Sequence, residues 1–349
     1  MKSIKGVGEF FALDIGSNAL RVVQLDGDIR SGWTLKHFAY SPIDRALTAD
    51  SSEVGKARLG EAIKLAIDQA GIKAKNVAVG MPSGKCFAAI VDMPNQPLDE
   101  LAKVVRYQAD QYIPMAVDDA QMDWAPLGPS PNDPEKVEVL LASTAKDFAE
   151  QIMEQIEDLG LNVVALEPNS ISMARSLMPV GATDARLLLD MGENSTDVAI
   201  VYNNGVRLIR AVPGGLQAMA RSVAGTLNVN EDQARQFILK FGLAQDKLEG
   251  HVFRALSPVL ESFAGELTKS IKFFENKYPN VKVGGIAISG FGGMIPFVPE
   301  YVEAKTGVVS QQGNPWQLVR VTPEQQQALA PVAMEFAVVL GLAERENNV

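Results

Sequence analysis

The chain has few of the side chains on which disulfide and zinc chemistry depend. Among its 349 residues there are one cysteine, Cys86, and two histidines, His37 and His251. A single cysteine cannot close an internal disulfide, and the two histidines do not form part of a Cys/His cluster of the kind that holds zinc. We therefore expect neither feature, and we interpret Cys86 and His251 as structural residues.

The chain also lacks long apolar runs and an excess of positive charge. No segment approaches the roughly 20 apolar residues that span a bilayer, and residues 336–343 are the longest suggestive stretch. Residues 1–9 lead directly into a strand that carries Asp14, so we expect no signal peptide and a cytoplasmic protein that begins near Met1. The formal net charge of −10 argues against nucleic acid and against direct contact with an anionic membrane.

Apolar residues recur with the periods of strands and helices along the chain and predict an α/β protein. Hydrophobic residues make up 47% of the sequence, which suits two domains at roughly 100–200 residues each. The predicted elements include strands near residues 9–15, 19–26, 33–40 and 76–80, helices over 54–70 and 252–274, and a final helix near 328–345.

A strand that ends in Asp-x-Gly occurs twice, about half a chain apart. Residues 11–25 read Phe-Ala-Leu-Asp-Ile-Gly-Ser-Asn-Ala-Leu-Arg-Val-Val-Gln-Leu, and residues 189–198 repeat their skeleton. The repeat predicts a duplicated lobe, each copy made of a strand, a tight turn and a second strand. The matched pairs are Leu13/Leu189, Asp14/Asp190, Gly16/Gly192, Asn18/Asn194 and Val22/Val198.

Turns of this kind suit phosphate chemistry. They can aim several backbone N–H groups at one point, and the aspartate can hold magnesium or its waters. Taken alone, one copy is more often an ordinary β-hairpin. Two facing copies would clamp the phosphate tail of a nucleotide.

A third glycine-rich element follows near the C-terminal end. Residues 286–294 are an apolar strand that runs into Gly290, Gly292 and Gly293. Two Asp-x-Gly turns followed by this strand resemble the actin-like ATPase superfamily. The resemblance implies an actin-like ATPase fold with two duplicated lobes. It also implies that the Asp-x-Gly turns bind phosphates and that the glycine-rich turn lies against adenosine.

Further segments narrow the resemblance. Residues 104–114, 123–124, 137–142 and 159–167, in this order, are similar to the inserted subdomain of the PilM family of type IV pilus assembly proteins, which is related to the division protein FtsA. The likeness runs from about residue 9 to 345. It implies a cytoplasmic nucleotide-binding adaptor, peripheral at the inner membrane through a partner. That partner would be the N-terminal tail of the membrane protein PilN, with other pilus inner-membrane components nearby.

The resemblance also implies a division of the chain. The first lobe would comprise residues 1–94 and 166–186, with the inserted subdomain at 95–165; the second lobe would comprise 187–220 and 283–349, with a helical subdomain at 221–282. An extended peptide would bind by strand addition in a cleft between the first lobe and the insertion.

By matching its motifs, the resemblance implies a site for ATP and magnesium. Asp14 and Asp190 would hold magnesium through water. Asp14, Asp190 and Glu167 are the candidates to orient an attacking water, and the sequence does not rank them. The nucleotide-binding residues would be Asp14, Gly16, Ser17, Asn18, Arg21, Gly192, Asn194, Thr196, Gly290, Gly292 and Gly293.

One part of the expected site departs from the family pattern. The family has Ala-Glu-x-x-Lys in its helical subdomain, and the acid and the lysine contact the ribose. Here residues 234–238 read Ala-Arg-Gln-Phe-Ile, so Arg235 and Ile238 replace both contacts. Hydrogen bonds to charged groups are worth about 1.5–3 kcal/mol each. We therefore expect ATP binding to be weak or rearranged, and whether ATP is hydrolysed stays open.

Two other functions stay open at this point. The actin-like fold also builds nucleotide-dependent filaments and division proteins, which pelleting with nucleotide would reveal. It also builds small-molecule kinases, for which the sequence shows no matching signature.

Overall fold

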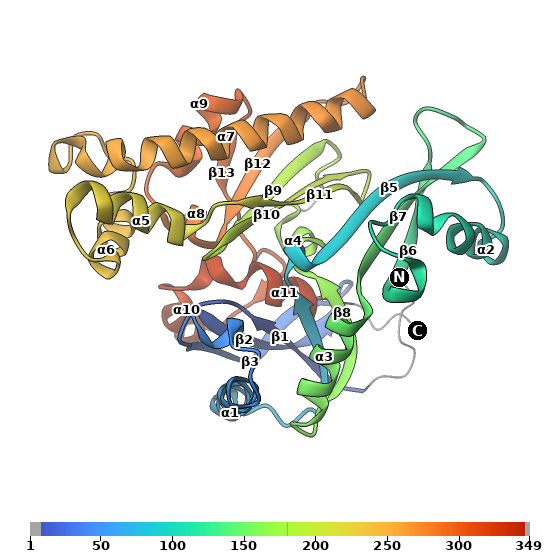
Figure 1. Ribbon diagram of the computed structural model, residues 1–349, viewed down its shortest axis with the longest axis horizontal. Helices are drawn as coiled ribbons and strands as arrows, with labels where there is room; N and C mark the ends of the chain where they lie inside the picture. The colour runs from blue at the N-terminus through green and yellow to red at the C-terminus, as the bar shows by residue number, and fades with distance from the viewer. Residues whose placement is uncertain (1–7, 180, 346–349) are drawn as a thin grey trace.

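The computed structural model describes residues 8–179 and 181–345 of the chain. In this part, the strands form a six-stranded, a five-stranded and a three-stranded sheet (Figure 1). The first two sheets are the centres of two lobes, and the third belongs to an inserted subdomain. The mixed α/β fold predicted from the sequence is confirmed.

The first sheet is built around a strand that is buried on both faces. In β1, Phe10–Ile15, Phe11 and Leu13 on one face and Ala12 on the other have no exposed surface, as is typical of a strand with a parallel neighbour in a covered sheet. The strand order is β14-β3-β2-β1-β4-β8. Its other strands are β2 (Ala19–Asp28), β3 (Gly32–Pro42), β4 (Asn76–Met81), β8 (Asn162–Pro168) and β14 (Val319–Arg320). Helix α1, Glu53–Ala70, covers one face and ends at Gly71, whose φ is 69°.

The second sheet repeats the arrangement of the first. Its order is β11-β10-β9-β12-β13, and β9 runs antiparallel to β10 and parallel to β12, as β1 does to β2 and β4. This shared order confirms the duplicated lobe that the repeated motif predicted. The strands are β9 (Ala185–Met191), β10 (Ser195–Tyr202), β11 (Gly205–Pro213), β12 (Val283–Ser289) and β13 (Ser310–Gln312). The helices that share a core with them are α5 (Leu216–Leu227), α6 (Glu231–Phe241), α7 (His251–Lys277), α8 (Gly290–Met294) and α9 (Val298–Thr306).

The inserted subdomain is a small sheet with one covering helix. Strands β5, Cys86–Pro94, and β6, Ala120–Pro129, flank β7, Lys136–Ala145, and α2, Leu98–Gln108, packs on them. Strand pairing therefore places the insertion at about 86–145 and not at 95–165. The physical reason is that β5 pairs with β7, whereas β8 and α3, Lys146–Glu157, pack in the first lobe.

A buried carboxylate ties the insertion to the second lobe. Glu138 on β7 forms ion pairs of 3.0 Å with Arg207 on β11 and of 3.0 Å with Lys277 at the end of α7. The Tyr278 hydroxyl donates a 2.6 Å hydrogen bond to the same carboxylate. Because Glu138 is only 1% exposed, water cannot solvate its charge, and these partners must do so. The insertion, which interrupts the chain of the first lobe between β4 and β8, is thus also attached to the second lobe.

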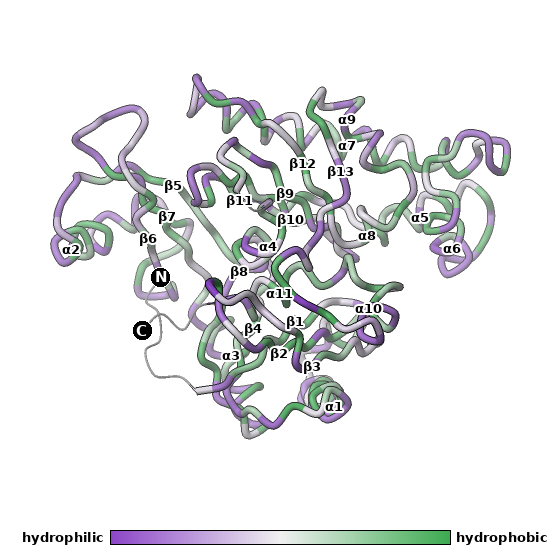
Figure 2. Tube along the Cα trace, turned by 180° about the vertical axis from the view of Figure 1, so that it is seen from behind, coloured by the Kyte–Doolittle hydropathy of each residue, from purple (hydrophilic) through white to green (hydrophobic). Residues whose placement is uncertain are grey.

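Two helices cross between the large sheets. Helix α4, Asn169–Leu177, follows β8 of the first lobe but packs on β9, β10 and β11 of the second. Helix α11, Ala337–Ala343, packs on β1, β2 and β4 of the first lobe. The two helices also pack on each other, near the centre of the molecule (Figure 2). A Cβ atom on Gly341 would lie 1.8 Å from the Ser172 carbonyl oxygen, so only glycine permits this contact.

The final helix predicted near residues 328–345 is interrupted. Helix α10, Pro323–Leu329, ends before Pro331, and the chain resumes in the 3₁₀ turn η6, Ala333–Phe336, and α11. The directions before and after this break differ by 98°. Proline has no amide hydrogen and its ring clashes with the preceding turn, so the helix cannot continue through it.

None of the described helices is by itself long and apolar enough to cross a membrane. The bent pair Pro323–Leu329 and Ala333–Ala343 reaches the length and apolar composition of a membrane span only when its two parts are taken together. Its second half is the buried helix α11 that separates the two sheets.

Replacing Gly341 tests the helix crossing. We expect Gly341→Ala to lower the free energy of unfolding by about 3 kcal/mol, because the added methyl group forces α4 and α11 apart. Urea denaturation measures this change. The matched control is Gly265→Ala in the middle of α7, where a Cβ atom meets nothing within 4 Å. This control should gain up to about 1 kcal/mol from its higher helix propensity. Equal midpoints for the two variants would contradict the close crossing.

Candidate functional site

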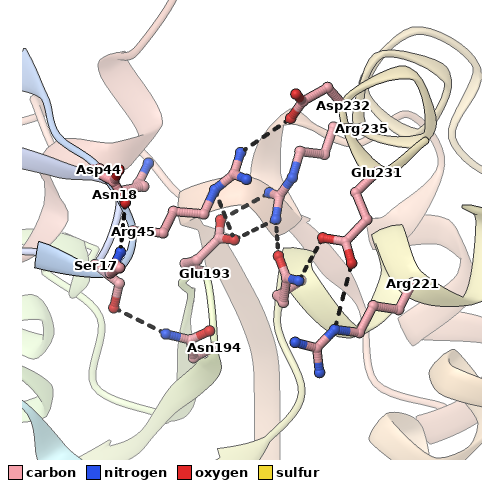
Figure 3. Close-up of polar contacts among 12 residues, drawn as sticks. Ser17, Asn18, Asp44, Arg45, Glu193, Asn194, Arg221, Glu231, Asp232 and Arg235 are labelled. Carbon is pink, nitrogen blue, oxygen red and sulfur yellow. Dashed lines mark hydrogen bonds and ion pairs between the residues drawn. The ribbon is translucent and has the colours of Figure 1, made fainter. Parts of the chain in front are cut away.

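The two Asp-x-Gly turns have the same local structure and face each other. The Gly16 amide donates to the Ala19 carbonyl at 3.1 Å, and the Gly192 amide donates to the Ser195 carbonyl at 2.9 Å. Each turn thereby places its aspartate at the end of the equivalent strand, β1 or β9. The Asn194 side-chain amide of the second turn donates to the Ser17 hydroxyl of the first at 3.1 Å (Figure 3). The tips of the two turns are therefore in direct contact.

A cavity of about 120 Å³ lies between these turns. The structure brings most of the predicted site residues together around it, but Thr196, Gly292, Gly293 and Glu167 do not line it. The predicted residues that do line it are Asp14, Gly16, Ser17, Asn18, Arg21, Asp190, Gly192, Asn194 and Gly290.

Arg21 is held by the protein's own carboxylates. Its guanidinium contacts Asp14 at 3.1 Å and also forms a buried ion pair with Glu335 of η6. It lies 5.3 Å from the centre of the Tyr40 ring, and the Tyr40 hydroxyl donates to Glu335 at 3.1 Å. The Asn18 amide donates to Glu335 at 3.2 Å. The cation nearest the first turn is thus already neutralised on two sides.

Asp14 itself is almost fully buried. Burial raises the pKa of its carboxyl above the ordinary value, and the adjacent Arg21 guanidinium opposes this only in part. Two nearby negative charges add to the pKa of Arg21, which is raised despite its own burial. The proton therefore stays on the guanidinium.

Asp190 and Asp197 lie opposite each other on β9 and β10. Burial raises the pKa of Asp190 to about 6, although the Ser289 hydroxyl donates a 2.7 Å hydrogen bond to its carboxylate. Burial and the charge of Asp190 raise the pKa of Asp197 to about 7. Like charges on directly opposed strand positions repel each other, and burial removes the water that would screen them.

Glu167 lies apart from the turns, at the end of β8. Its carboxylate contacts Arg175 at 2.8 Å and Arg345 at 3.0 Å, and it accepts a 2.7 Å hydrogen bond from the Ser172 hydroxyl. Burial alone would raise the pKa of Glu167, but these positive charges outweigh it and lower the pKa. Glu167 is thus the centre of a buried group of ion pairs beneath α4. We interpret it as a structural residue and do not propose that it orients a water molecule.

Beside the second turn, Arg235 pairs with Glu193. The guanidinium of Arg235 on α6 contacts both carboxylate oxygens of Glu193, one of them at 3.0 Å, and also the side chain of Gln217 (Figure 3). Arg45 of the first lobe approaches the same carboxylate at 3.5 Å and Asp232 on α6 at 3.6 Å. Both Glu193 and Arg235 are buried. Arg235, which the sequence placed at a ribose contact, is therefore engaged with the protein itself.

Nearly the whole chain matches the sequence model of one protein family. The sequence model of the family described as Type IV pilus assembly protein PilM matches residues 12–347. The chain belongs to this family.

Solved structures agree with the fold of this PilM-family chain. A structure described as the PilM-PilN type IV pilus biogenesis complex matches with a TM-score of 0.82 and 24% identity, covering 96% of this chain and 98% of that chain. The ethanolamine utilization protein EutJ from Carboxydothermus hydrogenoformans matches at 0.56 and 15% identity, over 98% and 91% of the two chains. MreB5 of Spiroplasma citri bound to ADP matches at 0.52 and 11% identity, over 95% and 94%. These likenesses confirm the actin-like ATPase fold.

The site of this chain does not offer the room that the resemblance implied. Small-molecule sites typically measure roughly 300–1,000 Å³, several times the 120 Å³ between the turns. The glycines expected to lie against adenosine are used in packing. A Cβ atom on Gly292 would meet Ile288 at 2.8 Å, and one on Gly293 would meet Met334 at 2.4 Å. They allow α8 to lie close to β9, β12 and η6.

The expected magnesium donors are also engaged elsewhere. Asp14 faces Arg21, and Asp190 faces Ser289. Within the described residues, no three His, Cys, Asp or Glu side chains form a group that could hold a metal ion. Although the turns have the residue types that suit magnesium and phosphate, their arrangement in this chain does not fit ATP with magnesium.

Several residues of the cavity were not singled out from the sequence. Asp197 lay inside the repeated motif, and its position opposite Asp190 follows from pairing the two strands of a hairpin. Glu335, which also lines the cavity, left no local signal, because it is 314 positions from Arg21 in the chain.

The raised pKa of Asp197 predicts a pH dependence of stability. In the folded protein this acid keeps its proton up to about pH 7, whereas in the unfolded chain it releases the proton near pH 4. Its contribution to stability is therefore complete below about pH 4 and is lost as the pH rises through 7. Asp197→Asn cannot titrate, and we expect it to be more stable than the wild type by on the order of 3 kcal/mol at about pH 8.

Urea denaturation at about pH 5 and pH 8 measures this difference, which should shrink at the lower pH. Asp118→Asn, at an exposed position in the insertion, is the matched control and should change stability by less than about 0.5 kcal/mol. A pH-independent difference between Asp197→Asn and wild type would contradict the raised pKa.

Proposed function

We propose that this chain is an adaptor of a type IV pilus assembly complex and that it binds the N-terminal tail of a PilN-like membrane protein. Its membership of the PilM family and its likeness to a solved PilM-PilN complex support the assignment. The observation that carries it is a groove between the inserted subdomain and the first lobe. The partner would hold the adaptor at the inner membrane, on its cytoplasmic side.

The groove measures about 870 Å³ and has mostly apolar walls. Strand β6 and helix α2 form one wall, and strand β8 and helix α3 form the other. Residues 163–166 of β8 and residues 120–124 of β6 line it along their length. A groove of this kind accepts an extended segment that has apolar side chains.

Both strands that border the groove are sheet edges. In the described part of the chain β6 pairs only with β7, and β8 pairs only with β4. An open edge presents N–H and C=O groups to an added strand, which then receives affinity from its backbone and specificity from alternate side chains. Strand addition is therefore the binding mode that these edges favour.

One polar side chain of the groove has no hydrogen-bond partner among the described residues. The Ser143 hydroxyl on β7 is buried and has no hydrogen-bond partner among the described residues. Leaving such a group unpaired costs about 1–3 kcal/mol. A peptide carbonyl or amide above β7 would satisfy it.

Binding of the tail can be tested with one substitution on β8. Val164 lines the groove and is partly buried, yet it does not belong to the first-lobe core. We expect Val164→Glu to weaken binding of a synthetic peptide of the PilN N-terminal tail from the same organism at least about tenfold, or about 1.4 kcal/mol, because a carboxylate would be desolvated beneath the peptide. Fluorescence anisotropy with a labelled peptide measures this affinity.

The matched control is Val54→Glu on α1, where the valine is 68% exposed and outside the groove. Its affinity for the peptide should equal that of the wild type. If the peptide bound both variants equally well, or did not bind the wild type, the proposed partner would be wrong. Pelleting of the wild type with nucleotide would then favour a filament-forming protein.

A further inference from the structure

The charged side chains around the second turn contact one another. Glu193 faces two guanidinium groups, those of Arg235 and Arg45, and Gln217 completes the contacts of Arg235 (Figure 3). Gln217 in turn donates to Glu231 at 2.7 Å. A bidentate arginine–carboxylate pair is the strongest common ion pair in proteins, and burial makes its separation costly. The buried Glu193–Arg235 pair is therefore a fixed part of the structure.

The cluster and the turn tips connect the two lobes. Arg45 lies in the first lobe after β3, whereas Glu193 and Asp232 belong to the second lobe. The hydrogen bond from Asn194 to Ser17 is a second link across the same gap. On the other side of the gap, the Arg21 guanidinium is already ion-paired with Asp14 and Glu335. The protein's own groups thus make both the polar contacts and the lobe-to-lobe contacts at the turns.

A nucleotide would have to displace these contacts. Entry of a triphosphate between the turns requires breaking the Ser17–Asn194 hydrogen bond, because those tips touch. Its negative charge would meet Arg21 and Arg235, but each guanidinium already has a buried carboxylate partner. Releasing Arg21 leaves the buried Asp14 and Glu335 without their cation, and releasing Arg235 leaves the buried Glu193 with only Arg45 at 3.5 Å. Separating either buried pair is strongly unfavourable. Binding of a magnesium–nucleotide complex would therefore carry a large unfavourable free energy, because these ion pairs would be broken.

We propose that the Glu193–Arg235–Arg45 cluster links the two lobes where a nucleotide would otherwise bridge them, and that this chain does not take MgATP. The two turns keep the sequence of phosphate-binding turns but hold each other. The adaptor is then fixed in one closed arrangement of the lobes, independent of nucleotide.

Calorimetry and hydrogen–deuterium exchange on the full-length chain test this proposal. We expect no saturable heat when MgATP is added up to about 5 mM, and no change in the midpoint of thermal unfolding, which a ligand with a Kd near 50 μM would raise by several degrees at that concentration. Amide exchange in residues 15–19 and 191–195 should also be unchanged by MgATP. A Kd below about 1 mM, or protection of either turn by MgATP, would overturn the proposal.

Two variants test the cluster directly. Glu193→Gln removes the charge that both arginines face, and it should lower the unfolding midpoint by about 5 °C or more and speed amide exchange in both turns. Arg45→Ala breaks only the link between lobes at a half-exposed side chain. It should speed exchange in the turns while leaving the midpoint within about 2 °C of the wild type, so that the test does not depend on a variant that unfolds.

The control for Glu193→Gln is Glu266→Gln, whose ion pairs with Arg210 and Lys269 lie on the surface of the second lobe. The control for Arg45→Ala is Arg58→Ala on the exposed face of α1. Neither control should alter exchange in the turns. Unchanged exchange in both Glu193→Gln and Arg45→Ala would contradict a link between the lobes. These readouts do not involve the peptide groove, so they stand or fall independently of PilN binding.

Discussion

The crossing of α4 and α11 is the contact on which the rest of the molecule depends. The backbone of Gly341 lies directly against Ser172, and the Ser176 hydroxyl donates a 2.6 Å hydrogen bond to the Ala337 carbonyl. Both helices share one apolar core with strands of both large sheets. The lobes cannot separate at this point without exposing that core to water, which hydrophobic burial opposes. The crossing therefore fixes how the two lobes face each other.

Both candidate sites follow from this crossing. Strand β8 leads directly into α4, so the outer edge of β8 is held next to the insertion and forms one wall of the groove. At the other end of the chain, Pro331 interrupts the helix, and η6 then delivers Glu335 to Arg21 just before α11 begins. The geometry that opens the groove beside the insertion thus also supplies the carboxylate that pairs with Arg21.

The fold of this chain and the contacts in its interlobe site lead to different expectations about nucleotide binding. Its fold matches that of an MreB5 bound to ADP. In this chain, however, the two Asp-x-Gly turns contact each other, and Arg21 and Arg235 beside them are paired with the protein's own carboxylates. A fold can keep its architecture while the site built on it changes, because a few side chains decide what binds. In this chain the groove beside the insertion is large and mostly apolar, whereas the interlobe cavity is small and its arginines are ion-paired with the protein's own carboxylates.

The sequence by itself determined most of the secondary structure, the duplicated lobe and the family likeness. These are written in short windows: the period of apolar residues, the glycine that ends α1, and the Asp-x-Gly turn that recurs at Asp14 and Asp190. Only the tertiary structure decided the limits of the insertion, because β5 pairs with β7, which lies about 50 residues later in the chain. It also decided the role of the charges, because Glu335 lies 314 positions from its partner Arg21, and Glu193 lies 42 positions from its partner Arg235. Ion pairs leave no periodic trace in sequence, so their partners emerge only when the chain is folded.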